Sequence, residues 1–491
     1  MNPNLAKFDH LVVVMFENRS FDNLAGYLYE GDKPKHFIPH DSRHTFNGVA
    51  GRTELANTDP TGKVIPVHKA PYDSQKAMTQ PSPDPGEEYP HINTQLYGAD
   101  EVSSDASALP DPAPMNGFVK DYINAIQTTE GWEDREDPTL DDYKKIMSCF
   151  PPEAVPVLSG LAKSFAISDE WFCSVPSQTF CNRSFFHSGS SNGFVTNSNY
   201  IKWTLDNKQA TIFERLSDGG HDWRVYWDKE DLFGSLTRMI HTPLLIPQYD
   251  PNFRTFEQFA QDCAAGDLPE YTFIEPRLFW DHNDMHPPVA DNPNVNSSIV
   301  AGEKLLNDIY NSVVESPLWE RTLLVVIFDE HGGCYDHVAP PVGAIPPDAH
   351  PEYPLQDGFR YDRFGVRVPA LFISPYIEPG TVVRSNQSFP FDHTSMVKTI
   401  CNRWNLAGLK DRDMHPNTPD IAHVLTRESP RSDVPKFTPR PYMRAPEENA
   451  LDTPISHLQL AMIEMATHLA EVTAPQFRTI GHAIQFLRKH F

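Results

Sequence analysis

The chain has 491 residues, with 66 Asp and Glu against 41 Lys and Arg, which gives a formal net charge of −25 at pH 7. At roughly 100–200 residues per domain, this length allows two or three domains or one large α/β domain with insertions. The acidic balance argues against binding to nucleic acid or to an anionic membrane, because the long-range field repels phosphate.

Four short apolar runs that end abruptly in polar residues predict central strands of an α/β sheet. In chain order they lie at residues 11–16, 271–274, 323–328 and 368–373. We expect the polar residues after these strands to gather at one edge, where open α/β sheets bind ligands. Apolar residues at i, i+3 and i+4 predict helices over 297–315 and 455–473.

Two segments differ in composition from the rest. Residues 31–115 are rich in Pro, Asp, Gly and Ser, which predicts a loop-rich insertion or cap near the site. Residues 408–452 are similar and are expected to wrap the surface. We therefore expect one catalytic domain over 1–440, with a helical extension over 441–491 packed on the same domain.

No apolar run reaches the roughly 20 residues needed to span a bilayer. The N-terminus shows no signal peptide, so we expect a soluble protein that is cytoplasmic, exported by another route or processed from a precursor. Contact with a membrane would be peripheral at most. Six cysteines without a C-x-x-C pair indicate reduced thiols rather than a zinc site or a disulfide scaffold.

Adjacent oxygen-bearing side chains follow two of the predicted strands. Glu17 and Asn18 come directly after the first strand, and Asp329 and Glu330 after the third. Four such groups, three of them anionic, would repel one another without a cation between them. The sequence therefore predicts one divalent metal ion, with Ca²⁺, Mg²⁺ or Mn²⁺ favoured by the oxygen ligands and Zn²⁺ possible. The alternative is a solvated acidic turn, with Ser20 capping a short helix.

A hydroxyl-rich loop joins an apolar segment to the predicted start of a helix. Thr179 is the candidate nucleophile and Ser177 the reserve. The free N–H groups and positive dipole end of a helix favour an alkoxide and phosphate oxygens there. The alternative is that both residues only cap the helix.

The chain has 21 histidines, and any one of them is more often structural than catalytic. His286 stands out because Asp284, two residues earlier, can orient its imidazole and keep it protonated as a general acid. His91, His337 and His393 also lie in polar motifs.

Six motifs, in this order, resemble those of the phosphoesterase family over about residues 8 to 406. That family contains bacterial phosphatidylcholine-hydrolysing and plant non-specific phospholipases C and a bacterial acid phosphatase. The motifs read ENRSFD at 17–22, SVPSQTFCNR at 174–183, NDMHP at 283–287, DEHGGCYDHV at 329–338, VRVPA at 366–370 and FDHTS at 391–395. The resemblance implies an alkaline-phosphatase-like αβα sandwich with a mostly parallel central sheet, and a one-metal phosphoesterase mechanism.

The resemblance also implies a role for each matched residue. The implied metal ligands are Glu17, Asn18, Asp329 and Glu330, and the implied nucleophile is Thr179. The residues implied to hold phosphoryl oxygens and assist the leaving group are His91, Asp284 and His286. The residues implied to surround and support the site are Asn182, Arg183, His337 and His393. Two positions depart from the family pattern: Met285 replaces an acidic residue near the expected substrate entrance, and Cys181 replaces a proline.

The expected function is phospholipase C-like cleavage of a glycerophospholipid through a phosphothreonine intermediate. The alternative is a broad-specificity acid phosphatase acting on small phosphate esters, and a remote alternative is a non-catalytic phosphate-binding protein. A sulfatase is disfavoured because no C-x-P-x-R segment occurs. Cys181 and Cys334 are expected close behind the site, as apolar fillers or as a redox-sensitive pair.

Overall fold

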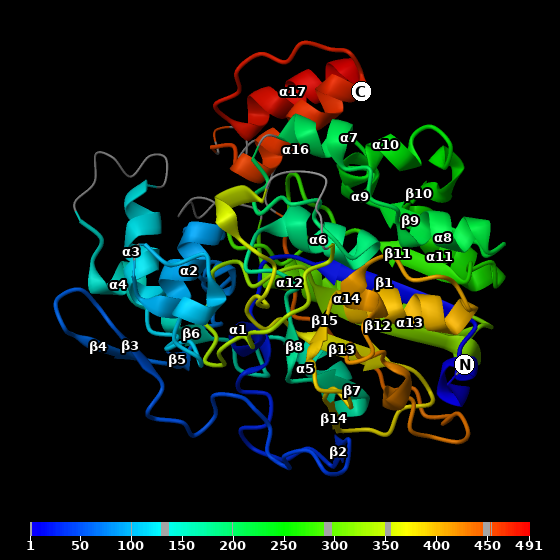
Figure 1. The fold of residues 1–491 in the computed structure, drawn as a ribbon, viewed down its shortest axis with the longest axis horizontal. Helices are drawn as coiled ribbons and strands as arrows, with labels where there is room; N and C mark the ends of the chain where they lie inside the picture. The colour runs from blue at the N-terminus through cyan, green and yellow to red at the C-terminus, as the bar shows by residue number, and fades with distance from the viewer. Residues whose placement is uncertain are drawn as a thin grey trace.

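The structure is a computed structural model, and it describes residues 2–99, 101–128, 137–198, 200–288, 297–348, 355–444, 452 and 454–491. A large sheet forms its centre (Figure 1). The strands of this sheet are β1 (His10–Phe16), β2 (His36–Ile38), β7 (Ala166–Ser168), β9 (Trp223–Trp227), β10 (Phe253–Thr255), β11 (Tyr271–Ile274), β12 (Thr322–Phe328), β13 (Ala370–Ile373) and β14 (Thr381–Val383). Within the described residues it has nine strands, in the order β10-β9-β11-β1-β12-β13-β7-β14-β2.

In the part of the chain that the structure describes, shorter strands form three two-stranded pairs outside this sheet. They are β3 (Ala56–Thr58) with β4 (Val64–Pro66), β5 (His68–Lys69) with β6 (Ser148–Cys149), and β8 (Trp171–Phe172) with β15 (Phe391–Asp392). The α-helices are α1 (Phe21–Ala25), α2 (Tyr89–Tyr97), α3 (Phe118–Thr128), α4 (Leu140–Tyr143), α5 (Pro156–Ser164), α6 (Thr179–Ser188), α7 (Tyr200–Asp206), α8 (Ile212–Asp218), α9 (Leu236–Ile240), α10 (Thr242–Leu245), α11 (Phe256–Ala265), α12 (Ile299–Glu315), α13 (Thr394–Trp404), α14 (Asp411–Met414), α16 (His457–Leu469) and α17 (Ile480–His490).

The direction of the strands decides which residues reach the site. β1 lies between β11 and β12 and is parallel to both. β13 is antiparallel to its neighbours β12 and β7, whereas the other pairs of this sheet are parallel. The expectation that all four predicted strands end at one edge is therefore wrong for β13. Its end, at Ser374, lies at the opposite edge, and its start, near Arg367, lies at the site edge instead.

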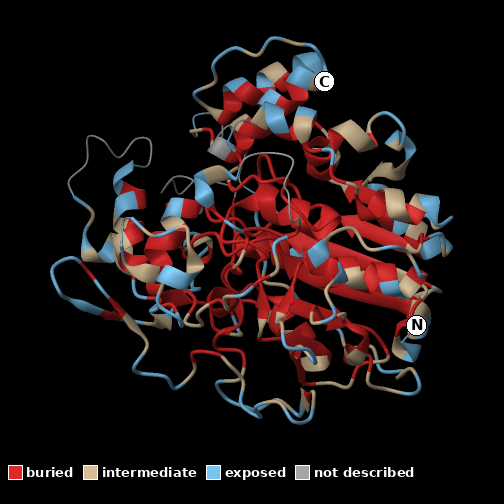
Figure 2. Cartoon of the chain, in the orientation of Figure 1, coloured by how far each residue is buried: buried red, intermediate tan, exposed pale blue. Residues whose placement is uncertain are grey.

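Alternate side chains of the sheet face two different helical layers. Trp223 of β9 and Tyr271 of β11 both pack against Phe213 of α8, with ring centroids 4.5 and 6.0 Å apart. Tyr226 of β9 lies on the other face and packs against Phe259 of α11. Helices α6, α8 and α13 contact one another, and α12 contacts α5 and α11. The expected α/β sandwich with a mostly parallel sheet is confirmed, and Figure 2 shows that sheet buried.

One buried carboxylate links two helices of the same layer. Glu303 of α12 is fully buried and accepts hydrogen bonds from the backbone N–H groups of Val157, at 2.7 Å, and Leu158, at 2.8 Å. These two donors belong to the first turn of α5, where helical N–H groups have no partner within the helix. Burial raises the pKa of Glu303 to about 8.

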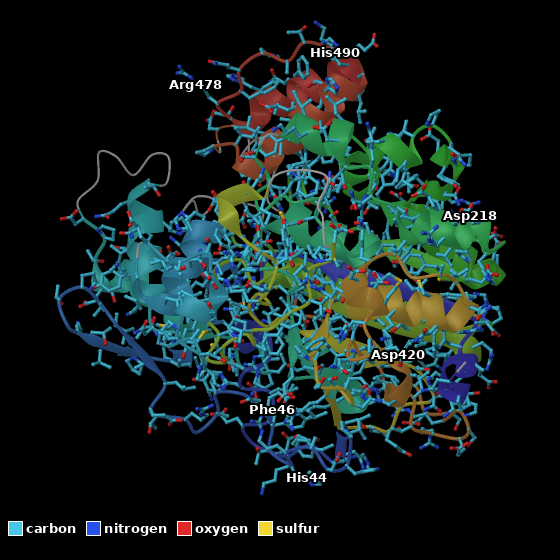
Figure 3. The ribbon with its side chains drawn as sticks, viewed as in Figure 1. His44, Phe46, Asp218, Asp420, Arg478 and His490 are labelled. Carbon is cyan, nitrogen blue, oxygen red and sulfur yellow. The ribbon has the colours of Figure 1, made fainter. Side chains whose placement is uncertain are left out.

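The predicted helix over 297–315 is found as α12, and the one over 455–473 as α16, which ends at Leu469. Helix α17, the last of the described residues, was not predicted from the sequence. Arg478, just before α17, and His490, its last residue, project into solvent (Figure 3). Segment 31–115 is largely loop but contains the β3–β4 hairpin and α2. Among the described residues, no helix is both long and apolar enough to cross a membrane.

Candidate active site

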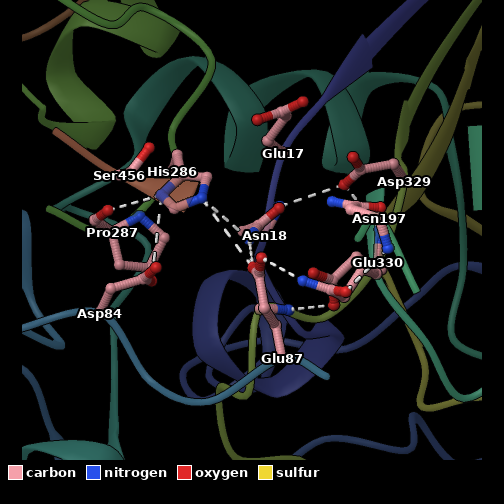
Figure 4. Close-up of polar contacts among 12 residues, drawn as sticks. Glu17, Asn18, Asp84, Glu87, Asn197, His286, Pro287, Asp329, Glu330 and Ser456 are labelled. Atoms are coloured by element: carbon pink, nitrogen blue, oxygen red, sulfur yellow. Dashed lines mark hydrogen bonds and ion pairs between the residues drawn. The ribbon is translucent and has the colours of Figure 1, made fainter. Parts of the chain in front are cut away.

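The four predicted metal ligands meet where β1 and β12 end. Phe16 pairs with Phe328 at the ends of these parallel strands, so the residues that follow lie next to each other. The backbone N–H of Asn18 donates to Asp329 Oδ1 at 3.2 Å. Glu17, Asn18, Asp329 and Glu330 are all fully buried, and Figure 4 shows them together.

Three of these residues carry an oxygen that has no hydrogen-bond partner among the described residues: Glu17 Oε2, Asn18 Oδ1 and Glu330 Oε1. A buried polar atom without a partner costs free energy, so such atoms point to a missing ligand. Carboxylate and amide oxygens are the ligands that hard divalent cations prefer. The chemistry of this cluster, which we call the open cluster, therefore fits a divalent metal ion.

Arg183 supplies the local positive charge. Its guanidinium pairs with Glu17 Oε1 at 3.0 Å and with Asp329 Oδ2 at 3.2 Å, and all three side chains are buried. Burial, and then the nearby Asp329 carboxylate, raises the pKa of Glu17 and of Glu330 well above the ordinary value. The single positive charge of Arg183 therefore does not neutralise the negative charges of the cluster.

Two glycines after Glu330 allow the chain to pass close to the rest of the site. Gly332 and Gly333 have φ values of 58° and 64°. A Cβ at Gly332 would lie 2.4 Å from Asn18 O, and one at Gly333 would lie 2.5 Å from Gly86 O. Only glycine fits both the backbone conformation and these contacts. The second contact brings the loop around Gly86 to the site.

Thr179 is the first residue of α6, as predicted, and it follows a tightly held loop. The side-chain amide of Asn182 donates to Ser177 O at 2.7 Å and to Val175 O at 3.2 Å. Ser177 Oγ donates to Val195 O at 2.6 Å. Thr179 Oγ1 is buried and has no partner among the described residues. Of the two candidate nucleophiles, Thr179 is thus the one with a free hydroxyl.

Glu87, which was not predicted from the sequence, lies inside the site. Its carboxylate accepts hydrogen bonds from Asn18 Nδ2 and, at 3.2 Å, from Gln178 Nε2. Glu87 Oε2 lies 4.0 Å and Asp84 Oδ1 3.9 Å from ring nitrogens of His286. Asp84, Glu87 and His286 form a group that could itself hold a metal ion. The available signal was the place of these acids in an insertion expected to lie near the site.

His286 is oriented differently from the expectation. Its backbone N–H, not its ring, donates to Asp284 Oδ1 at 2.9 Å, and Asp284 Oδ2 faces His282 Nδ1 at 2.8 Å. The His286 ring donates from Nδ1 to Pro287 O at 2.6 Å, so Nε2 accepts from Asn18 Nδ2 at 3.0 Å. Burial lowers the pKa of His286 to about 4. Asp284 therefore fixes the backbone of His286 and does not keep the ring protonated.

The other predicted histidines contact the site to different degrees. His393 Nε2 donates to Asp329 O at 2.6 Å, so this ring holds the backbone of Asp329 in place. His91 Nδ1 lies 2.8 Å from Asp121 Oδ1 on the neighbouring helix. Gln95 joins Asp121 to the ring of His331, the residue after Glu330. His91 is thus connected to the site through a chain of hydrogen bonds.

His337 belongs to a second buried group, which we call the paired cluster: Asp22, Asp336, His337 and Arg367. Arg367 Nε donates to Asp336 Oδ1 at 3.0 Å, and Arg367 Nη2 donates to Asp22 Oδ1 at 3.1 Å. The other Asp22 oxygen faces His337 Nδ1 at 2.5 Å. No carboxylate oxygen of this cluster lacks a partner.

The two departures from the family pattern are packing residues here. Met285 is fully buried and packs so closely on Gly302 of α12 that a Cβ there would lie 2.3 Å from Met285 Cγ. The expectation that it lies at the substrate entrance is wrong. Cys181 donates to Phe194 O at 3.4 Å, and Cys334 to Asn18 O at 3.7 Å.

Comparison with known sequences identifies the class of protein to which this α/β fold belongs. The model of the phosphoesterase family matches residues 8–407. The chain therefore belongs to the phosphoesterase family and is a hydrolase that acts on phosphoric esters.

Individual relatives extend over nearly the whole chain. Non-specific phospholipase C3 of Arabidopsis thaliana is 34% identical over 483 residues, which cover 94% of this chain and 83% of the relative. Phospholipase C A of Mycobacterium tuberculosis is 25% identical over 450 residues, which cover 82% of this chain and 74% of the relative. Among solved structures, a protein of the alkaline phosphatase superfamily from Vibrio parahaemolyticus aligns with 52% of this chain and 61% of its own, at 13% identity and a TM-score of 0.32.

Proposed function

We propose that the chain is a metal-dependent phospholipase C that cleaves the phosphodiester of a glycerophospholipid through a phosphothreonine intermediate. Relatives named as phospholipases C, which match most of the chain, support the substrate class. The observation that carries the proposal is the buried, unpartnered hydroxyl of Thr179. Thr179 and Arg183 are four residues apart on α6 and share one helix face, and Arg183 contacts two residues of the open cluster.

The proposed metal ligands are Glu17, Asn18, Asp329 and Glu330. A divalent ion bound there would act as a Lewis acid: it would offset the negative charge of the phosphoryl oxygens and favour ionisation of the attacking hydroxyl. The chain's own contribution is to hold these groups rigidly: Asn182 fixes the loop before Thr179, and His393 fixes the backbone of Asp329. The N–H groups at the start of α6 add further donors for phosphate oxygens.

In the proposed reaction, Thr179 Oγ1 forms a bond to phosphorus while the bond from phosphorus to the glycerol oxygen breaks. The hydroxyl proton leaves to solvent, and the leaving alkoxide takes up a proton from water. The neutral His286 ring accepts from Asn18 Nδ2, which leaves Asn18 Oδ1 available as a ligand. Water then cleaves the bond between phosphorus and Oγ1, which releases the phosphorylated head group and restores the hydroxyl. His91 is linked to this site through Asp121, Gln95 and His331.

The substrate class is tested with purified protein loaded with Ca²⁺, Mg²⁺, Mn²⁺ or Zn²⁺ in turn. We expect release of phosphocholine from phosphatidylcholine vesicles at a higher kcat/KM than hydrolysis of p-nitrophenyl phosphate. Activity on the monoester alone would overturn the phospholipase assignment in favour of an acid phosphatase, which would use the same nucleophile and ligands.

The nucleophile is tested with Thr179→Ala. We expect a loss of kcat of roughly 10³-fold or more, because no other described hydroxyl of this loop is free. The thermal midpoint should change little, since Thr179 Oγ1 has no hydrogen bond to lose. Ser177→Ala is the matched control: it removes a hydrogen bond to Val195 O and should retain most activity. Equal losses in the two variants would contradict the assignment.

A further inference from the structure

The part of the chain that follows residue 407 lies outside the match to the family model. It nevertheless contacts the loop that carries His286. Gln459 of α16 donates from Nε2 to Phe279 O. Upstream of α16, Tyr442 Oη donates to Asp281 Oδ1 at 2.8 Å, and Arg444 Nε lies 2.7 Å from Asp281 Oδ2. Three side chains from outside the family region thus hold one active-site loop.

Gln459 is connected to His286 by hydrogen bonds. Its Nε2 lies 3.4 Å from His282 Nε2, and His282 Nδ1 lies 2.8 Å from Asp284 Oδ2. Asp284 Oδ1 in turn accepts the backbone N–H of His286 at 2.9 Å. The path from α16 to His286 therefore runs through Gln459, His282 and Asp284.

The start of α16 fixes the orientation of the Gln459 amide. Gln459 is 1% exposed. Its Oε1 accepts the backbone N–H of Ser456 at 2.8 Å, and Ser456 Oγ accepts the backbone N–H of Gln459 at 3.0 Å. This reciprocal pair is a capping box. Because Oε1 is used in the cap, Nε2 must point at the loop.

The loop contains backbone conformations that need outside support. Asp281 has a φ of 49° and Met285 a φ of 74°, in the left-handed region that side-chain-bearing residues rarely adopt. Such conformations persist where surrounding contacts over-determine them. Asp281 is held by Arg277 at 3.0 Å as well as by Tyr442 and Arg444.

Apolar packing adds to these polar contacts. The loop residues Phe279 and Trp280 share one buried cluster with Leu458 and Met462 of α16. The Arg444 guanidinium lies 4.8 Å from the centroid of the Trp280 ring. The helix and the loop are therefore packed as one unit.

We propose that α16 and the segment 442–444 are a working part of the active site, and that Gln459 is a positioning residue for His286. The inference rests on the proposed function for its kinetic consequence. Gln459 acts through the loop backbone and through Asp284, and it does not touch the substrate.

The test compares Gln459→Met with Ser456→Ala in the full chain. The first removes both the amide donor and its half of the cap, and the second removes only the Ser456 half of the cap. We expect Gln459→Met to lower kcat on phosphatidylcholine about 10- to 100-fold, because His286 contacts Asn18 and small misplacements of the groups around a reacting centre cost this much. KM should stay within about twofold, and Ser456→Ala should retain kcat.

A second measurement does not depend on activity. Amide hydrogen exchange in residues 279–286 should become about tenfold faster in Gln459→Met and stay unchanged in Ser456→Ala. Unchanged exchange in Gln459→Met, unchanged kcat, or equal effects in both variants would overturn the proposal. If the wild-type chain hydrolyses no phosphodiester, the proposed function fails, and the exchange measurement alone decides whether Gln459 positions the loop.

Discussion

The open cluster and the paired cluster are both buried groups of acidic residues behind the same sheet edge, yet their oxygens are satisfied very differently. In the paired cluster, Arg367 and His337 provide donors to Asp22 and Asp336. In the open cluster, three oxygens lack a partner. Asp22, Asp336 and His337 of the paired cluster fit a metal site by ligand type and spacing. The missing partners, rather than the residue types, distinguish a site from a structural ion pair.

The largest effect should follow from breaking the paired cluster. Arg367→Met leaves two buried carboxylates without their cation, so we expect a loss of about 3–5 kcal/mol in the free energy of unfolding. The measurement is urea unfolding followed by circular dichroism. Arg360→Met is the matched control, because Arg360 is 60% exposed and its ion pair with Asp105 contributes little. A loss no larger than that of the control would contradict the comparison.

A smaller effect should come from filling the open cluster. A divalent ion that binds the folded protein at about 100 times its Kd stabilises it by about 2.7 kcal/mol. We therefore expect the thermal midpoint to rise when the chelated protein receives the preferred ion. Glu330→Gln should lose most of this rise, since it removes one proposed ligand. The same rise in wild type and variant would place the ion elsewhere.

The smallest effect concerns Glu303, whose buried carboxylate is paired with backbone N–H groups alone. Its folded pKa, about 8, lies above the ordinary 4.5. The folded state therefore binds the proton more tightly, and stability is lost as pH rises between these two values. From about pH 6 to pH 7, wild type should lose up to about 1.4 kcal/mol relative to Glu303→Gln. Parallel pH profiles of the two proteins' unfolding free energies would refute this.

Local patterns in the sequence were enough for the elements that build the open cluster. Buried strands need continuous apolar residues, so the apolar runs predicted β1 and β12 directly. Glu17 and Asp329 are the first residues after these strands. Ser20 caps α1 as expected, with Oγ accepting the N–H of Asn23 at 3.1 Å. Thr179 begins α6 because the loop before it is tied down by Asn182.

Contacts between distant segments could not be predicted in the same way. The direction of β13 depends on its pairing with β12 and β7, which the residues of β13 do not encode locally. Glu87 reaches the site through the close approach of Gly86 and Gly333. The support of His286 by Gln459 likewise joins segments with no shared pattern. Long-range packing, not local preference, decides these positions.

The central place of β1 has a consequence for how the protein is made. Leu11 pairs with Tyr271 on one side and with Leu323 on the other. Both edges of β1 therefore stay unpaired until these residues, which are synthesised much later, are available. At about 5–20 residues per second, translation takes more than ten seconds to reach them. During that time an apolar strand with two unpaired edges is exposed to other nascent chains. Protection by chaperones during synthesis is therefore expected to govern the yield of this enzyme more than its final stability does.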